Sequence, residues 1–252
     1  MSQKNLNKKL DILFKGLKIK KGDKIIIHSN TAGVLQFYKK KKEDLCKTFI
    51  SYLKNYIGSN GVIIIPTYNY QFTKKNDFNI KTTSSEVGYF SNYLIQKNWN
   101  KRTLDPIFSH IIFGNISDFN FKNINTEAFG KDSIFASFQK NNFKIFCFCC
   151  SPNNITYLHF IENILKVSYR FVKRFTGNLI YKNNKKKIIY KYNVGKKSLD
   201  YSIKEKKILK ILNDKEFKRK KFGKFECYLF ESNALIKKLS KILEKNEYYL
   251  IK

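Results

Sequence analysis

Apolar residues along the first third of the chain predict helices that alternate with buried strands. Residues 4–17 and 42–57 carry their large apolar side chains at helical spacing. Two short, continuously apolar runs, KIIIH at 24–28 and VIII at 62–65, are typical of strands buried on both faces. Pro66 stops the second run. This strand–helix–strand order predicts parallel pairing in a sheet that helices cover.

The remaining two thirds extend the same arrangement. Further strands are predicted at 109–113 and 144–150, and further helices at 84–97, 153–165, 203–212 and 232–246. Residues 177–194 alternate around Asn183-Asn184 and predict a hairpin. We therefore expect an α/β fold with a central mixed, largely parallel sheet flanked by helices and an additional antiparallel hairpin in the C-terminal third. No repeat or linker interrupts it, so residues 1–252 are expected to form a single domain.

The charge of the chain invites a nucleic-acid interpretation. There are 50 Lys+Arg against 19 Asp+Glu, a formal net charge of +31. Lys, Asn, Ile, Phe and Tyr are also the residues that AT-rich codons specify, so compositional drift explains the excess without a binding site. No helix-turn-helix, ribonucleoprotein or zinc-finger pattern accompanies the basic runs. A non-catalytic basic protein that binds nucleic acid remains the alternative from a different class.

Cysteine and glycine patterns exclude several kinds of site. The number of cysteines, five, is odd and no signal peptide precedes them, so we expect reduced thiols and a cytoplasmic protein. No cysteines have the spacing of a zinc site, so we expect no metal. No apolar run is long enough to span a membrane. Glycine-rich loops of the ATP- or dinucleotide-binding types are missing. Strand alternation over 144–150 places Cys147 and Cys149 on one face and Cys150 on the other.

Three histidines are the candidates for a general base near neutral pH. His159 and Glu162 are at i and i+3 of a predicted helix, where a carboxylate can hold the imidazole in one tautomer. An ordinary amphipathic helix with an inward histidine would give the same spacing. His28 ends a strand, at the position where α/β sheets present ligand-binding loops. His110 lies within an apolar strand, which favours a structural role.

Six segments, in order, resemble the aminoglycoside 3-N-acetyltransferase family of antibiotic N-acetyltransferases. They are Gly22-Asp23 followed by IIIHSN, then GVIIIPTYNY, SSEVGYF, RTLDPIFSH, AFGKDSIFASF and ITYLHFIE. The resemblance covers roughly residues 10–175 and implies a single acyltransferase domain. It also implies acetyl-CoA, or another acyl-CoA, as co-substrate and the amine of an amino sugar as acceptor.

The resemblance also assigns site residues. By it, His159 is the general base and Glu162 its partner in direct transfer without a covalent enzyme intermediate. The residues expected to border acyl-CoA are His28, Ser29, Asn30, Pro66, Thr67, Tyr68 and Thr156. Two departures from the family pattern, Asp105 where it has histidine and Tyr157 where it has serine, lie near the expected acceptor.

The net charge of the chain bears on the identity of the acceptor. A strongly positive field favours anions, so we expect a nucleotide-linked amino sugar used in surface glycan synthesis. The alternative is a free aminoglycoside, with antibiotic resistance as the outcome. Glu86 and Asp105 are the expected acceptor-binding residues, because together they could form an acidic pocket within a basic shell.

Overall fold

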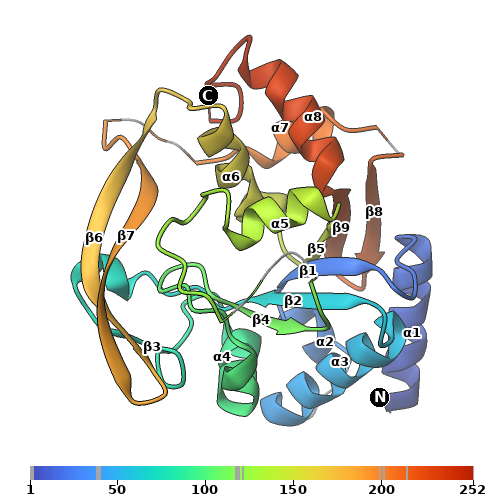
Figure 1. Cartoon of the computed structure of the whole chain (residues 1–252). Helices are drawn as coiled ribbons and strands as arrows, with labels where there is room; N and C mark the ends of the chain where they lie inside the picture. The colour runs from blue at the N-terminus through green and yellow to red at the C-terminus, as the bar shows by residue number, and fades with distance from the viewer. Residues whose placement is uncertain are drawn as a thin grey trace.

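A computed structural model describes residues 3–37, 41–116, 120, 122–198, 200, 202–213 and 215–251. A six-stranded mixed sheet forms its centre, in the order β4-β2-β1-β5-β9-β8 (Figure 1). The strands are β1 (Lys24–Ser29), β2 (Val62–Pro66), β4 (His110–Phe113), β5 (Lys144–Phe148), β8 (Phe217–Phe222) and β9 (Phe225–Glu231). β1 pairs in parallel with β2 and β5, and the outer pairs are antiparallel. The expected mixed α/β sheet is confirmed, with parallel pairing confined to its centre.

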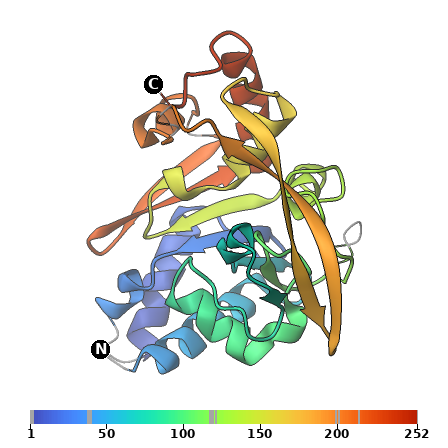
Figure 2. The same ribbon diagram turned by 90° about the vertical axis from the view of Figure 1, so that its left-hand side faces the viewer.

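Helices cover both faces of this sheet (Figures 1 and 2). One face carries α1 (Gln3–Gly16), α2 (Ala32–Leu35), α3 (Lys42–Ile57) and α4 (Tyr89–Asn98), and the other carries α5 (Ile134–Lys140), α6 (Tyr157–Ile164), α7 (Glu205–Lys210) and α8 (Ser232–Leu243). Each face buries its own apolar cluster, because successive strand side chains point to opposite sides. Short 3₁₀ turns complete the chain at η1 (Gln71–Lys74), η2 (Trp99–Lys101) and η3 (Pro152–Asn154). Within the described ranges no helix is long and apolar enough to cross a membrane.

A second sheet stands at one side of the molecule as a long twisted ribbon (Figure 2). It contains β3 (Phe78–Asn79), β6 (Arg170–Tyr181) and β7 (Asn184–Gly195). The predicted hairpin exists, but it begins seven residues earlier than the expected start at 177. Its turn is centred on Lys182 and Asn183, both with positive φ (48° and 64°), one position before the predicted one.

Three local predictions were wrong. The strands β8 and β9 were missed. In β8 four successive Lys and Arg residues mask any apolar alternation, whereas β9 carries none and its apolar pattern was overlooked. Helix α4 begins at Tyr89 and not near Ser84, since Gly88 adopts a φ of 125°. β5 ends at Phe148, and Cys149 turns away with a φ of 56°. Cys147 and Cys149 therefore pack in opposite apolar clusters.

Candidate active site

One cavity of about 560 Å³ opens where the parallel strands end. β1 ends at Ser29 and β2 at Pro66, and His110 at the start of antiparallel β4 pairs with Pro66 at the same edge. The cavity is lined by Ile27, His28, Ser29, Pro66, Tyr68, Tyr70, Glu86, Val87, Gly88, Ser91, Cys150, Asn153, Asn154, Ile155, Thr156 and His159. Its place agrees with the general position of ligand sites in α/β sheets.

His159 reaches this cavity from helix α6. Its side chain is 25% exposed, and its Nδ1 lies 2.7 Å from Oε2 of Glu162, one helical turn away. Nδ1 also lies 2.9 Å from Nη2 of Arg170, and a guanidinium only donates hydrogen bonds. We assign the hydrogen of Nδ1 to the shorter contact with the carboxylate, which only accepts, so the lone pair is on Nε2 and the Arg170 contact is not a hydrogen bond. The arrangement suits a neutral imidazole that receives a proton from a ligand in the cavity.

Glu162 lies behind His159 and is completely buried. Its Oε1 accepts a hydrogen bond from the Tyr169 hydroxyl at 2.7 Å, and its Oε2 lies 2.6 Å from Nε of Arg170. Burial alone would raise the pKa of Glu162. The contacts with His159, Arg170 and Tyr169 outweigh burial and hold that pKa below its ordinary value. The carboxylate is therefore ionised at neutral pH.

The end of β1 forms another part of the wall. His28 is only 8% exposed, and burial lowers the pKa of its imidazole to about 4. Its Nε2 is buried and has no hydrogen-bond partner among the described residues. Ser29 lines the cavity beside it, whereas Asn30 is not part of the wall. The Asn30 side chain instead accepts a hydrogen bond from the backbone N–H of Ala32, so it shapes the turn.

Tyr68 and Pro66 come from the end of β2. The hydroxyl of Tyr68 lies 3.0 Å from Nε2 of His110, and burial raises the pKa of Tyr68 well above its ordinary value. Thr67 between them is completely buried and points away from the cavity wall. Its Oγ1 bonds Ser109 and accepts from Arg102, so Thr67 anchors the loop that carries Tyr68.

Glu86 is exposed and lies on the cavity wall. Its carboxylate accepts hydrogen bonds from the backbone N–H of Tyr70 at 2.6 Å and from the Gln71 side chain at 2.5 Å. Glu86 is the only carboxylate among the described residues of the wall, and no Lys or Arg belongs to that set. Although the chain has 50 Lys+Arg, the described part of this wall carries no permanent cation.

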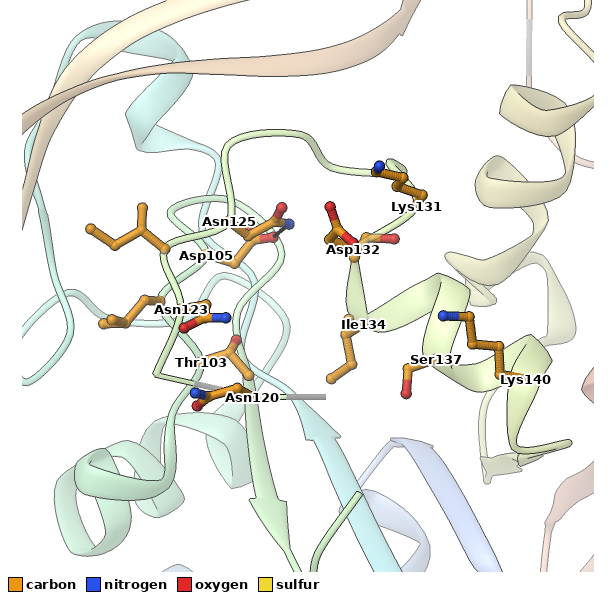
Figure 3. Close-up of a pocket in the computed structure, with 13 residues that line it drawn as sticks. Thr103, Asp105, Asn120, Asn123, Asn125, Lys131, Asp132, Ile134, Ser137 and Lys140 are labelled. Atoms are coloured by element: carbon orange, nitrogen blue, oxygen red, sulfur yellow. Dashed lines mark hydrogen bonds between the residues drawn. The ribbon is translucent and has the colours of Figure 1, made fainter. Parts of the chain in front are cut away.

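Asp105 lies elsewhere. It borders a second cavity of about 190 Å³, formed by residues 103–105, by loop residues up to Asn125 and by the start of α5 (Figure 3). Its carboxylate accepts from the backbone N–H groups of Ile107 and Phe108, from Tyr190 and from Asn125. Burial raises the pKa of Asp105 despite these neutral donors. The structure therefore separates Asp105 from Glu86, and the expected acidic pair does not form.

The structure brings most of the predicted residues together and adds others. His28, Ser29, Pro66, Tyr68, Glu86, Thr156 and His159 share the wall, and Glu162 lies directly behind it. Sequence reasoning missed Tyr70, Cys150, Tyr169 and Arg170. Tyr169 and Arg170 could not be found from helical spacing. Arg170 lies eleven positions after His159 and on a different element, and Tyr169 directly precedes it. No group of His, Cys, Asp and Glu suited to a metal occurs within the described part of the chain.

Comparison with known proteins points to one family. The sequence pattern of the family described as aminoglycoside 3-N-acetyltransferase matches residues 26–244. No curated protein matches the chain in sequence. Among solved structures, AAC-IIIb with CoASH superposes with a TM-score of 0.77 at 14% identity, covering 97% of both chains.

Two further structures show the same likeness. Aminoglycoside acetyltransferase AAC(3)-IIb gives a TM-score of 0.77 at 16% identity, over 95% of this chain and 97% of that one. The YokD protein from Bacillus subtilis gives 0.75 at 15% identity, over 98% of this chain and 94% of that one. At such identities the likeness establishes the fold.

Proposed function

Because this chain belongs to the aminoglycoside 3-N-acetyltransferase family and is therefore an N-acyltransferase whose family uses acetyl-CoA, we propose that it acetylates an amine of an aminoglycoside. The observation that carries this proposal is His159 on the wall of the cavity of about 560 Å³, with Glu162 2.7 Å behind its Nδ1. Family membership also replaces the non-catalytic nucleic-acid alternative with an enzyme.

His159 performs the proton transfer in this proposal. The acceptor amine attacks the thioester carbonyl, a C–N bond forms, and Nε2 of His159 takes the proton that the amine must lose. The C–S bond then breaks, and the proton passes from the imidazolium to the departing CoA sulfur. The ionised Glu162 stabilises the imidazolium through Nδ1. Direct transfer requires no covalent enzyme intermediate.

The parts of the wall divide between the two substrates. His28, Ser29 and Thr156 line the same cavity as His159, and we assign the acyl group and the pantetheine arm to them. The CoA phosphates would gain from the overall positive field of a chain with net charge +31. Glu86, with Tyr70 and Val87 at the exposed rim, would then meet the acceptor.

Local charge favours a cationic acceptor. The sequence led us to expect a nucleotide-linked amino sugar, because the net charge attracts anions. The wall has the opposite character, since it carries Glu86 and, among its described residues, no Lys or Arg. Screening limits the range of the field from the distant lysines to roughly 8 Å at physiological ionic strength. Glu86, in contrast, would act on the acceptor at contact distance. The family comparison and the wall both support the free aminoglycoside.

The test compares kcat/KM for sisomicin and for a UDP-linked amino sugar with acetyl-CoA, by following thiol release and the mass of the product. Measurements at low and moderate salt separate the field of the whole chain from that of the wall. We expect sisomicin to be acetylated faster at both salts. Faster turnover of the UDP-linked sugar at both salts would overturn the acceptor and leave the enzyme class intact. Glu86→Gln should weaken the binding of sisomicin, seen as a higher KM for sisomicin, and leave the KM for acetyl-CoA unchanged.

A further inference from the structure

A guanidinium completes the cluster behind the proposed base. Arg170 is the first residue of β6, and its side chain is only 4% exposed. Its Nε lies 2.6 Å from Oε2 of Glu162, and its Nη2 lies 2.9 Å from Nδ1 of His159. A permanent cation therefore contacts both members of the pair.

The charges of this cluster can be counted. Burial favours a net charge near zero, because each unbalanced charge is costly where water is excluded. Glu162 with Arg170 already sums to zero, so His159 is left as a neutral imidazole. If Arg170 were absent, the buried Glu162 would obtain its counter-charge by keeping a second proton on His159. An imidazolium cannot accept a proton from an amine.

We propose that Arg170 is a positioning residue that balances the charge of Glu162, so that His159 stays neutral with its hydrogen on Nδ1. The consequence for turnover rests on the proposed role of His159 as base. The charge balance itself concerns the free protein and can be measured without any substrate. The same guanidinium, 2.9 Å from the ring, also opposes a lasting imidazolium, so His159 would release its proton readily after each transfer.

The other titratable groups around His159 do not supply this charge. Tyr169, which directly precedes β6, donates a hydrogen bond to Glu162 as a neutral group. Burial and that carboxylate raise the pKa of Tyr169. On the cavity side the titratable lining residues are His28, Tyr68, Tyr70, Glu86 and Cys150. Burial keeps His28 neutral, with a pKa of about 4, and raises the pKa values of Tyr68 and Tyr70. Glu86 and Cys150 contribute no positive charge.

The test measures the ring nitrogens of His159 by ¹⁵N NMR at pH 7 in the free protein. Assignment is simple, because the chain has three histidines. We expect a neutral ring protonated at Nδ1 in the wild type and in Arg170→Lys, which keeps the charge. In Arg170→Met we expect an imidazolium. The double variant Glu162→Gln, Arg170→Met removes both charges, and its His159 should be neutral again.

Matched controls separate charge balance from damage to the fold. Arg174→Met makes the same change four residues along β6 at an exposed position and should leave the His159 signals unchanged. In kinetics, Arg170→Met should lose about tenfold or more in kcat at pH 7, with the KM for acetyl-CoA kept, and should recover as the pH rises. Arg170→Lys should restore most of the rate.

Two results would overturn the proposal. One is a neutral His159 at pH 7 in folded Arg170→Met. The other, decisive if Arg170→Met does not fold, is an imidazolium in Arg170→Lys or in the double variant. If the wild type acetylates no amine, the proposed function fails, and the NMR comparison still decides whether Arg170 sets the charge of His159.

Discussion

Glu162 and Asp105 are both buried carboxylates, but their surroundings differ in kind. Glu162 contacts the imidazole of His159 and the guanidinium of Arg170, and its pKa is lowered. Asp105 meets neutral donors, the backbone of Ile107 and Phe108 and two side chains, and its pKa is raised. Burial penalises both charges, and at Glu162 the interactions with His159, with the permanent cation of Arg170 and with Tyr169 outweigh that penalty.

The difference agrees with the reactive role that we propose for Glu162 and with a structural role for Asp105. A carboxylate ionised beside an imidazole can stabilise a charge that appears and disappears during turnover. A carboxylate that accepts from two successive backbone N–H groups and from Tyr190 instead fixes a turn and joins it to β7. Sequence position near a family motif suggested a substrate role for Asp105, and burial at 3% exposure argues against direct contact with an acceptor.

The largest expected effect tests the reactive side. His159→Ala should lower kcat by about 10²–10⁴-fold, the usual contribution of a general base. Binding of CoA, measured by calorimetry, should be nearly unchanged, because His28, Ser29 and Thr156 remain in the wall. Asp105→Asn is the matched control and should keep kcat close to that of the wild type. Equal losses of kcat in both variants would remove the distinction between the two carboxylates.

The next effect is on stability, and its pH dependence should have opposite sign at the two sites. Glu162→Gln leaves Arg170 buried beside a neutral partner and should cost about 3 kcal/mol in the free energy of unfolding at neutral pH. The folded pKa of Glu162 is depressed, so its contribution is present above the ordinary value of 4.5 and is lost as pH falls through the folded pKa. The cost of Glu162→Gln should therefore shrink in acid.

For Asp105 the folded pKa is raised, so the stability that its protonated form provides is lost as pH rises from 3.8 through the folded pKa. The cost of Asp105→Asn should therefore be larger in acid than at neutral pH. Urea unfolding of both variants between pH 3.5 and pH 7 measures these trends. Parallel trends would mean that the two carboxylates share one kind of environment.

The smallest effects come from two matched tyrosines. Tyr169 donates to Glu162 at 2.7 Å, and Tyr190 donates to Asp105 at 2.8 Å. Tyr169→Phe should cost about 1.5 kcal/mol in unfolding free energy, as expected for a hydrogen bond to a charged acceptor, and Tyr190→Phe about 1 kcal/mol, the usual value for a hydrogen bond. Tyr169→Phe should also lower kcat severalfold by loosening Glu162, whereas Tyr190→Phe should leave kcat alone. A fall in kcat confined to Tyr190→Phe would reverse the assignment of roles.

Sequence reasoning succeeded where the controlling interactions are local. The i, i+3 spacing of His159 and Glu162 and the apolar run that ends at His28 are properties of single elements. Tyr169, Arg170 and Tyr190 could not be found in this way, because none of them lies on the same element as the carboxylate that it contacts. Asp105 was assigned to the acceptor because the pattern does not report burial. The strand β8 was missed because this edge strand consists mainly of Lys and Arg.

The ribbon of β6 and β7 supports both carboxylates at once. Its first residue, Arg170, holds Glu162, Tyr190 on the neighbouring strand holds Asp105, and Asn193 ties the ribbon to Asn163 on α6. If the ribbon detached from the main sheet, both acids would lose partners in the same event. The ribbon and α6 should thus behave as one cooperative folding unit, and hydrogen exchange of their backbone amides should report a common free energy of opening. The rate at which this unit opens would then limit the time for which His159, the proposed base, keeps its contacts with Glu162 and Arg170.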